Sequence, residues 1–430
     1  MKKLNIGLIG FGTIGSGVVK LVQKNKKLIF EKTGIKLELK KIADIDIKTD
    51  RGVKVDKKIL TTDANEIFQD SEIDIVIELV GGTTIAKDFV ITALNSGKHV
   101  VTANKALLSR YGKQIFKTAE RNKKYIQFEA SVGGGIPIIK VIKESLAANK
   151  IEQIYGIMNG TTNYILTRME EDKIDFKEAL KQAQELGFAE ADPTLDISGG
   201  DAAHKLQILA SIGFNKYIED SKIYYEGIEN IDLTDIMYVS DLGYKIKLLA
   251  IAKIENKEIE CRVHPTIIPD RHLLSSINDE FNAIYVKGDA MGPQLFYGKG
   301  AGSLPTASAV VSDILDIAKK LMDNNQNYTE KFYNENPNLK IKNFKDISSR
   351  YYFRFHTVDK PGVLAKIASI LGKFNISLTS VIQKETGQKV VPIVMLSHKA
   401  YENDVQKALK EIKKLNIVKN LKIIRIEDLS

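Results

Sequence analysis

The stretch LNIGLIGFGTIGSGVVKLVQKN (4–25) decides the fold of the first part of the chain. Its apolar run at 4–9 predicts a buried strand, and the amphipathic pattern from residue 13 predicts a helix. Between them stand glycines at 10, 12 and 15, in the spacing G-x-G-x-x-G. The order of strand, glycine turn and helix is typical of an α/β domain that binds a dinucleotide.

Each glycine of this turn has its own task in such a fold. Gly10 permits the tight turn, Gly12 lets the backbone approach a pyrophosphate, and Gly15 lets helix and strand pack closely. The N–H groups at the helix start, which includes Thr13 and Ile14, favour a phosphate. A glycine-rich turn without a ligand is the alternative that the motif alone leaves open.

Further alternation extends the pattern to a doubly wound sheet. Residues 35–46 predict a second strand ending near Asp44, where such folds place an acid on the adenosine ribose hydroxyls. Residues 73–82 and 98–105 predict two more strands, with a helix at 85–97 between them. Ligands bind beyond the carboxyl ends of parallel strands, so three residues there are expected to border the cofactor: Gly81, Thr102 and Lys105.

A second stretch, GFAEADPTLDISGGDAAHKL (187–206), concentrates negative charge beside a glycine pair. A helix that begins near Ser198 would place Asp201 and Lys205 on one face, at i and i+4. The several carboxylates of this stretch would repel one another unless a nearby cation offsets their charge. The four acids of this stretch are Glu190, Asp192, Asp196 and Asp201.

This charge pattern is suited to a small zwitterionic substrate. An α-ammonium group would satisfy the carboxylates, and a lysine would stabilise the oxygen charge that develops when an aldehyde is reduced beside a nicotinamide. A lysine also supplies the proton, or removes it in the reverse direction. Lys105 and Lys205 are the candidates, whereas His204 points to another face of the helix and is expected to pack. An exposed ion pair in a solvated loop is the alternative.

The composition excludes several classes of protein. The 430 residues are 43% hydrophobic and 27% charged, as in ordinary globular chains. The net charge of +9 comes from scattered lysines without interleaved aromatics, which argues against a nucleic-acid partner. No apolar run approaches the roughly 18 residues of a membrane span. A single cysteine, Cys261, and a start unlike a secretory signal predict a cytoplasmic protein.

The order of patterns predicts three domains. The last of them has a complete βαββαβ pattern of its own, so we expect it to be removable without loss of the reaction. The ranges are a dinucleotide-binding domain at 1–130 to which the chain returns at 303–322, an α+β substrate and dimerisation domain at 131–302, a linker at 323–349 and a regulatory domain at 350–430.

With these residues placed, the chain resembles homoserine dehydrogenases of the longer form, which end in an ACT domain. The segment 183–205 carries the resemblance most specifically, supported by GIMNGTTNYILTRM (156–169) and VVTANKALLS (100–109). The resemblance implies a Rossmann-type domain, a ferredoxin-like ACT domain, and NAD- or NADP-dependent interconversion of L-aspartate 4-semialdehyde and L-homoserine. It also implies a homodimer or homotetramer.

The family's functional residues are carried over position by position. The resemblance implies substrate binding by Glu190, Asp196 and Asp201, catalysis by Lys205, and a place for Lys105 near both substrate and nicotinamide. Gly187 and Gly302 would approach the cofactor. A monovalent cation, Na⁺ or K⁺, would be held largely by backbone carbonyls in EASVGGGI (129–136), at Glu129, Val132, Gly134 and Ile136.

Two features leave alternatives open. Many relatives carry a valine–arginine pair where this chain has Asp44 and Ile45, and an acid there favours NAD over NADP unless Lys48 and Arg51 hold the extra phosphate. Gly362 matches the ACT loop at which an amino acid, threonine by resemblance, would bind as effector. A purely dimerising ACT domain, another small-metabolite reductase, and a non-enzymatic amino-acid sensor are the remaining readings.

Overall fold

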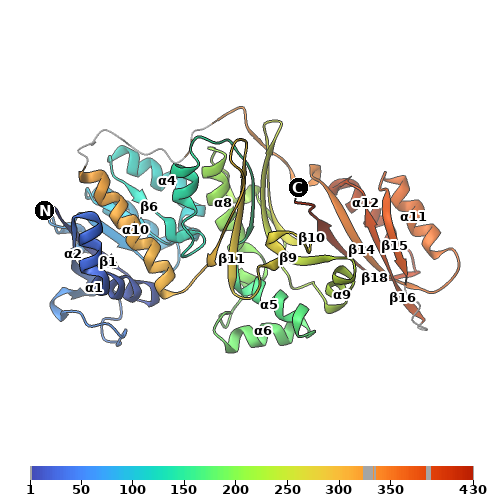
Figure 1. The fold of residues 1–430 in the computed structure, drawn as a ribbon, viewed down its shortest axis with the longest axis horizontal. Helices are drawn as coiled ribbons and strands as arrows, with labels where there is room; N and C mark the ends of the chain where they lie inside the picture. Colours follow the sequence, from blue (N-terminus) through green and yellow to red (C-terminus); the bar gives the residue numbers. More distant parts are fainter. Residues whose placement is uncertain (1, 323–332, 334–335, 384–388, 430) are drawn as a thin grey trace. The chain divides into compact units, whose positions relative to one another are not determined.

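The protein is described by a computed structural model that covers residues 2–322, 333, 336–383 and 389–429 (Figure 1). The chain forms two compact units. The first comprises Met1–Gly160, Asp201–Ser221 and Phe281–Asn338, and the second comprises Thr161–Gly200, Lys222–Glu280 and Leu339–Ser430. No helix among the described residues is both long enough and apolar enough to cross a membrane.

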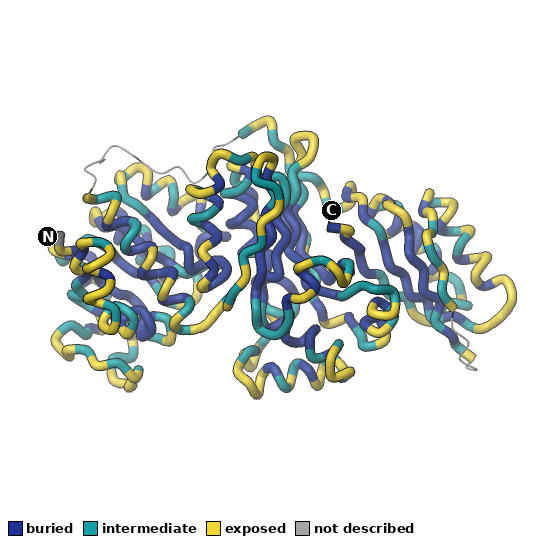
Figure 2. The backbone as a smooth tube through the Cα atoms, in the orientation of Figure 1, coloured by how far each residue is buried: buried dark blue, intermediate teal, exposed yellow. Residues whose placement is uncertain are grey.

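The first unit contains a six-stranded parallel sheet in the order β3-β2-β1-β4-β5-β6. This is the doubly wound order, and the predicted Rossmann-type fold is confirmed. Both faces are covered by helices, so the central strands are buried along their length (Figure 2). The elements are β1 (Lys2–Ile9), α1 (Thr13–Thr33), β2 (Ile35–Ala43), β3 (Leu60–Thr61), α2 (Asn65–Gln69), β4 (Ile75–Glu78), α3 (Thr84–Asn95), β5 (His99–Thr102), α4 (Lys105–Arg121) and β6 (Ile126–Gln127).

A helix from much later in the chain, α10 (Ser303–Met322), completes this core. Its apolar face, with Ala307, Val310 and Ile314, belongs to the same buried cluster as Leu4 of β1. The remaining elements of the first unit are an antiparallel trio in the order β12-β11-β7 and the helix α8. Their bounds are β7 (Ile151–Ile157), α8 (Gly200–Gly213), β11 (Phe281–Gly288) and β12 (Gly292–Lys299).

The second unit is built around a long hairpin of β9 (Tyr244–Glu255) and β10 (Glu258–Pro269). Its two-residue turn, Asn256 and Lys257, has positive φ at both positions, as the tight turns that suit twisted strands require. The other elements before residue 340 are α5 (Gly160–Glu171), α6 (Phe176–Glu185), α7 (Thr194–Ile197), β8 (Tyr224–Tyr225) and α9 (Leu233–Asp241).

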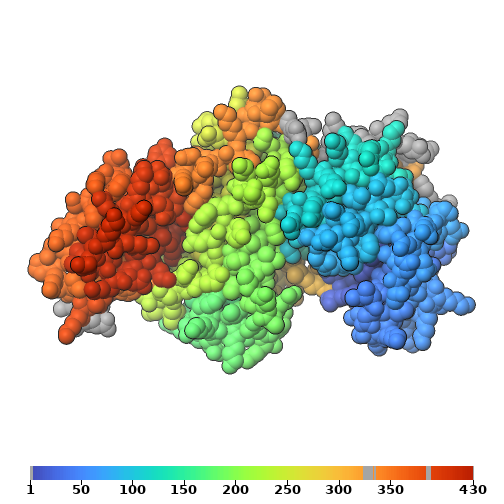
Figure 3. All heavy atoms as spheres, turned by 180° about the vertical axis from the view of Figure 1, so that it is seen from behind, coloured from blue at the N-terminus to red at the C-terminus, as the bar shows by residue number. Residues whose placement is uncertain are grey.

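The C-terminal part of this unit has the predicted βαββαβ fold, with strand order β18-β14-β16-β15. Helices α11 and α12 share one apolar core with the sheet. Strand β18 also pairs in parallel with β10, so the C-terminal sheet adjoins the hairpin. Figure 3 shows the residues near the C-terminus, coloured red, gathered together. The elements are β14 (Ser348–Val358), α11 (Val363–Lys373), β15 (Leu378–Gln383), β16 (Val390–Ser397), β17 (Ala400–Tyr401), α12 (Glu402–Ile412) and β18 (Val418–Ile426).

The range expected to be a linker is packed where it is described. Strand β13 (Lys340–Ile341) pairs with β10, and the ring of Phe344 stacks on Tyr224 at 3.5 Å between centroids. Ile347 is buried. Residues 323–332 and 334–335 of the expected linker lie outside the described residues. The segment that precedes the ACT domain is therefore part of the fold of the second unit from Lys340 onward.

Candidate active site

The structure brings the two candidate lysines together on one carboxylate. Oδ1 of Asp201 lies 3.0 Å from Nζ of Lys105, and Oδ2 lies 2.7 Å from Nζ of Lys205. Asn159 donates a further hydrogen bond to Oδ2 at 2.9 Å, and Lys205 donates to the carbonyl of Met158 at 2.6 Å. Asp201 therefore serves to hold the two ammonium groups in place, in addition to any contact with substrate.

Burial makes this cluster electrostatically strong. Asp201 is 3% exposed and Lys205 is 8% exposed, whereas the side chain of Lys105 is 34% exposed. Burial alone would raise the pKa of Asp201, but the charges of Lys205 and Lys105 outweigh it and lower that pKa. Asp201 is thus a permanent anion, and Lys105 is the more accessible cation.

Local sequence explains where each lysine sits. Lys105 is the first residue of α4, whose N-cap Asn104 accepts a hydrogen bond from the N–H of Leu107 at 3.0 Å. An ammonium at the positive end of a helix strengthens the local attraction for an anion. On α8, Lys205 follows Asp201 by one turn, as the spacing predicted. His204 faces Asp220 at 3.9 Å instead.

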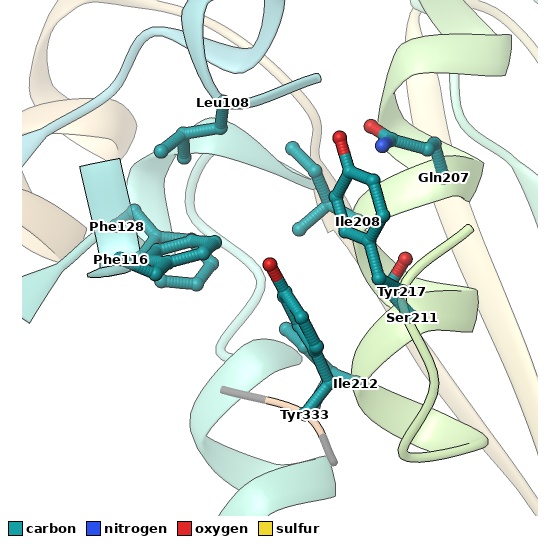
Figure 4. A pocket seen from close by; sticks show the side chains of 9 residues that line it. All are labelled: Leu108, Phe116, Phe128, Gln207, Ile208, Ser211, Ile212, Tyr217 and Tyr333. Carbon is teal, nitrogen blue, oxygen red and sulfur yellow. The ribbon is translucent and has the colours of Figure 1, made fainter. Parts of the chain in front are cut away.

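Helices α4 and α8 are packed together behind the lysines. The buried amide of Gln207 donates to the carbonyl of Ser109 at 3.3 Å and to that of Ile218 at 2.7 Å. Figure 4 shows aromatic rings gathered around a small hollow beside these helices. None of the lining residues is charged, so the hollow does not suit a zwitterion. Its lining residues are Leu108, Phe116, Phe128, Gln207, Ile208, Ser211, Ile212, Tyr217 and Tyr333.

The other acids of 187–206 belong to the second unit and have different environments. Glu190 is exposed, and Asp196 lies 3.4 Å from the hydroxyl of Thr161. Thr161 also donates to the carbonyl of Phe188 at 2.6 Å, which fastens this loop to α5. Asp192 accepts hydrogen bonds from Thr194 at 3.1 and 2.5 Å and so has a structural task. Glu190 is the carboxylate most open to a ligand.

Close backbone packing accounts for the glycine pair in this loop. Gly199 has a φ of +86°, and a Cβ there would lie 3.1 Å from the carbonyl oxygen of Glu226. A Cβ on Gly200 would lie 2.9 Å from the side chain of Leu195. The sequence predicted a close approach at this pair, and the approaching backbone is that of the chain itself. Gly187, with a φ of +76°, follows the end of α6.

The glycine turn after β1 has the geometry that dinucleotide binding requires. Gly10 has a φ of +96°, and a Cβ on Gly15 would lie 2.1 Å from the Gly10 carbonyl oxygen. A Cβ on Gly12, in contrast, would meet nothing within 4 Å. Helix α1 has no side-chain cap and no acid in its first turn, so its N–H groups are available to an anion. The turn therefore fits a pyrophosphate.

Two more predicted cofactor positions border this turn. The hydroxyl of Ser303, at the start of α10, donates to the carbonyl of Thr13 at 2.8 Å, which places Gly302 beside the glycine turn. Asp44 follows β2, and its carboxylate accepts hydrogen bonds from the N–H groups of Phe11 and Asp46. Arg51 is engaged by Asp46 at 3.0 Å. The acid at position 44 therefore faces the turn, and Arg51 of the following loop already has a partner.

A buried acid that sequence reasoning missed lies at the carboxyl edge of the sheet. Glu78 ends β4, and its carboxylate accepts hydrogen bonds from the hydroxyl of Thr102 at 2.6 Å and the N–H of Val80 at 2.8 Å. Both Glu78 and Thr102 are completely buried, so Thr102 shapes the edge from inside, while Gly81 is exposed there. An acid at the end of an otherwise apolar strand was the available signal.

We expect Glu78 to make the free energy of unfolding decrease as pH rises from about 4.5 to about 7. Burial raises its pKa from 4.5 to about 7, despite the hydrogen bonds from Thr102, Val80 and Asn104. The unfolded chain loses this proton near pH 4.5 and the folded chain near pH 7, so stability is full below the lower value and is lost toward the higher. The loss is about 3 kcal/mol, at ~1.4 kcal/mol per pKa unit.

Chemical denaturation of the wild type and of Glu78→Gln over this pH range measures the effect. The slope of stability against pH should be shallower in the variant because glutamine does not titrate. Equal slopes would assign the pH dependence to other groups.

The loop expected to bind a cation is ordered by its own contacts. The Glu129 carboxylate accepts hydrogen bonds from the N–H groups of Ile139 at 2.8 Å and Lys140 at 2.7 Å. A Cβ on Gly134 would lie 2.5 Å from the backbone of Gly300. This close packing accounts for a glycine at position 134 without invoking a ligand. No cluster of three acidic, histidine or cysteine side chains suited to a metal occurs among the described residues. Of the four carbonyl oxygens predicted to hold a cation, those of Glu129 and Ile136 accept backbone hydrogen bonds, from the N–H groups of Val132 at 3.4 Å and Ile138 at 2.9 Å.

The ACT domain has a hollow at the end of its first strand. Gly362 caps α11 with a φ of +83°, and a Cβ there would meet nothing within 4 Å. Asp359 and Lys360 give the hollow one charge of each sign, and Gln383 adds an amide. The lining is Thr357, Val358, Asp359, Lys360, Pro361, Gly362, Val363, Leu364, Gln383 and Ile393. Such a set suits a small amino acid.

Comparison with known proteins matches all three parts of the chain. The family model for the homoserine dehydrogenase NAD-binding domain matches residues 10–129, that for homoserine dehydrogenase matches 137–315, and that for the ACT domain matches 351–416. The chain belongs to the homoserine dehydrogenase family. It is accordingly an NAD(P)-dependent oxidoreductase, and the resemblance seen in 183–205 is confirmed.

Individual members of the homoserine dehydrogenase family are similar over all or most of the chain. A homoserine dehydrogenase of Neisseria gonorrhoeae is 42% identical over 100% of both chains. The crystal structure of one from Thiobacillus denitrificans has a TM-score of 0.94 at 41% identity, covering 100% of this chain and 99% of its own. A hyperthermophilic archaeal homoserine dehydrogenase, solved in complex with NADPH, has a TM-score of 0.62 at 26% identity, covering 74% and 98%.

Proposed function

We propose that this chain interconverts L-aspartate 4-semialdehyde and L-homoserine, with Lys205 and Lys105 at the reacting oxygen. The observation that carries the proposal is the buried Asp201 carboxylate between the two ammonium groups, at 2.7 and 3.0 Å. Two cations held on one anion form a preorganised site for a third group that carries negative charge. A reaction that creates an alkoxide from an aldehyde has such a group in its transition state.

The residues divide the work according to their environments. Lys205, buried and fixed by Met158 and Asp201, donates a proton to the oxygen in reduction and removes the hydroxyl proton in oxidation. Lys105, more exposed, stabilises the charge on that oxygen. Glu190 and Asp196 supply anions for the substrate ammonium. The coenzyme, when bound, supplies or accepts the hydride.

The glycine turn and the start of α1 are the proposed place for the coenzyme diphosphate. Gly12 leaves open space, Gly10 and Gly15 let the chain turn tightly, and the N–H groups of the first turn, at Thr13 and Ile14, have no side-chain cap. Gly81, Gly187 and Gly302 complete the set of proposed neighbours, and the buried Thr102 supports this edge from inside.

An assay of reduced nicotinamide absorbance, with homoserine and either NAD or NADP, tests the activity. We expect reduction of the coenzyme, with no reduction when an alcohol lacking the amino and carboxylate groups replaces homoserine. A folded protein that is inactive with homoserine and both coenzymes would refute the proposal. Turnover of the simple alcohol would favour a general small-metabolite reductase.

Coenzyme preference should follow Asp44. Its carboxylate, beside the glycine turn, would accept from ribose hydroxyls and repel a 2′-phosphate, so we expect NAD to have the higher kcat/KM. Asp44→Ala should narrow the difference, and Asp50→Ala, an exposed acid of the same loop, should not. Measured preference of the wild type for NADP would show that Lys48 and Arg51 decide instead.

We also propose that the hollow around Gly362 binds an amino-acid effector, threonine being the first candidate by family resemblance. The carboxylate of Asp359 could pair with the ammonium group of an amino acid, and the ammonium of Lys360 with its carboxylate. Gly362→Val should abolish inhibition by threonine, because it places a side chain at the hollow and at a φ of +83° that disfavours one. Asp359→Asn, which adds no backbone strain, should weaken inhibition without lowering basal activity. If threonine does not inhibit the wild type, other amino acids are tested, and insensitivity to all leaves the domain a dimerisation element.

The proposed cation at the 129–136 carbonyls is tested by exchange of salts. Na⁺ or K⁺ should raise the unfolding temperature above that in a salt of a bulky organic cation at the same ionic strength. Equal unfolding temperatures would remove the cation from the proposal.

A further inference from the structure

Residues 226–228 pack backbone to backbone against residues 197–199. The N–H of Ile228 donates to the carbonyl of Ile197 at 2.9 Å. A Cβ on Gly227 would lie 2.1 Å from that same carbonyl oxygen. This hydrogen bond and the close approach at Gly227 join the two segments.

This packed turn leads directly into the lysine cluster. Asp201 follows Gly199 by two residues, and Gly199 itself lies against the carbonyl of Glu226. Asp196, one of the proposed substrate ligands, immediately precedes Ile197. The position of residues 226–228 therefore bears on both the substrate loop and the start of α8.

The side chain of Glu226 is held by the ACT domain. Arg425 of β18 donates from Nη1 to Oε2 of Glu226 at 2.9 Å, and the hydroxyl of Tyr224 donates to the same oxygen at 2.9 Å. The other side of the guanidinium forms two hydrogen bonds with Glu402, at 2.9 and 2.8 Å. Arg425 is 2% exposed and Glu402 1%, and the guanidinium lies 4.8 Å from the ring centre of Phe344.

The same cluster reaches the strand that borders the effector hollow. Tyr351 of β14 donates to Glu402 at 2.9 Å and pairs with Arg425 in the sheet register. Strand β14 continues to Thr357 and Val358, which line the hollow. Glu402 is also the first residue of α12, so strand, helix and arginine meet at one carboxylate.

We infer that Arg425 and Glu226 are positioning residues for the reaction. They hold segment 226–228, and through it the turn before Asp201, in the arrangement that turns over homoserine. An effector in the hollow would act by changing this contact, and that second part rests on the proposed effector site. Neither residue touches the reacting atoms. Because the turn that they hold lies between Asp196 and Asp201, their loss should lower kcat/KM for homoserine and leave coenzyme affinity unchanged.

The test compares two carboxylates that both pair with buried arginines of the ACT domain. Glu226→Gln removes the charge that meets Arg425. The matched control is Asp232→Asn at the N-cap of α9, which removes the charge that meets Arg354 of β14 and leaves segment 226–228 intact. Their side chains are similarly exposed, 33% and 42%, and asparagine can still cap α9. Steady-state kinetics, coenzyme affinity and unfolding temperature are measured for both.

We expect Glu226→Gln to lower kcat/KM for homoserine about five- to tenfold, with coenzyme affinity unchanged, because small misplacements of a catalytic turn are costly. Asp232→Asn should stay within about twofold of wild type. Glu226→Asp, which keeps the charge, should recover part of the loss. If Glu226→Gln matches the control in kcat/KM, the positioning role is overturned.

Further measurements distinguish the positioning role of Glu226 from its coupling to an effector. Should Glu226→Gln not fold, Tyr224→Phe removes one hydrogen bond from the same carboxylate and is judged by the same kinetic criterion. An effector that inhibits the wild type but inhibits Glu226→Gln equally well would overturn the coupling alone. A wild type that no amino acid inhibits would refute the proposed effector site, while the homoserine kinetics still decide the positioning role.

Discussion

Replacing Lys205 by alanine should lower kcat for homoserine oxidation by about 10²- to 10⁴-fold, the range for a lost general acid–base group or oxyanion donor. Lys205 is 8% exposed, and two short hydrogen bonds, to Met158 and Asp201, fix its ammonium group. Water admitted by the truncation would not reproduce that position. Asp201 keeps Lys105 and Asn159 as partners, so the variant should fold and bind coenzyme normally.

The matched control for this substitution is Lys117→Ala, an exposed lysine on α4. It should retain wild-type kinetics, since it removes one charge without touching the cluster. Near wild-type turnover by Lys205→Ala would exclude the proposed role. A loss in KM alone, with kcat preserved, would make Lys205 a binding residue instead.

Replacing Arg354 by methionine should lower the free energy of unfolding by about 3–5 kcal/mol, the cost of breaking a buried ion pair from one side. Arg354, on β14, donates to both oxygens of Asp235 on α9, at 2.6 and 2.9 Å. The arginine is 1% exposed and the acid 0%. Without the guanidinium, the buried carboxylate keeps only the hydroxyl of Tyr352, at 3.1 Å, among these partners.

The loss should depend on pH in a defined direction. Burial already raises the pKa of Asp235 above 3.8, against the opposing effect of Arg354, and removing the arginine raises it further. A raised pKa means that stability is present at low pH and is lost as pH rises. The difference between wild type and variant should therefore be smallest below pH 4 and largest near neutrality.

Chemical denaturation of the full chain measures both features. Lys373→Met is the control, because its pair with Glu411, at 2.6 Å, is exposed on the ACT surface and should contribute less than about 1 kcal/mol. A loss for Arg354→Met no greater than that of the control would show that the buried pair adds nothing to stability.

These buried pairs bear on whether the ACT domain can be removed. The sequence predicts a separable unit at 350–430 because its strand–helix pattern is complete. In the fold, β18 pairs with β10, and Arg262 of that hairpin pairs with the buried Glu427. Arg354 pairs with the buried Asp235 of α9, and Arg425 pairs with the half-buried Glu226. Truncation would expose an unpaired strand edge, so we expect a shortened chain to lose stability.

The sequence by itself determined those features that depend on residues close together along the chain. The glycine turn at 10–15 and the apolar runs around it specify a parallel sheet, since turn chemistry and strand burial act over a few residues. The pair Asp201 and Lys205 could be predicted because one helical turn separates them. The reaction was inferred from the resemblance of residues 183–205 to homoserine dehydrogenases.

Only the tertiary structure decided which distant groups share a charge or a backbone contact. Lys105 forms an ion pair with Asp201, which lies far from it in the sequence. The close approach at Gly199 is made by the backbone of Glu226 and not by a ligand. The acid Glu78 gains its raised pKa from burial that no local pattern reports. Arg425 joins the ACT domain to the turn before the catalytic helix because β18 lies beside β10. Sequence patterns record what neighbouring residues impose, and pairing between distant strands places the rest.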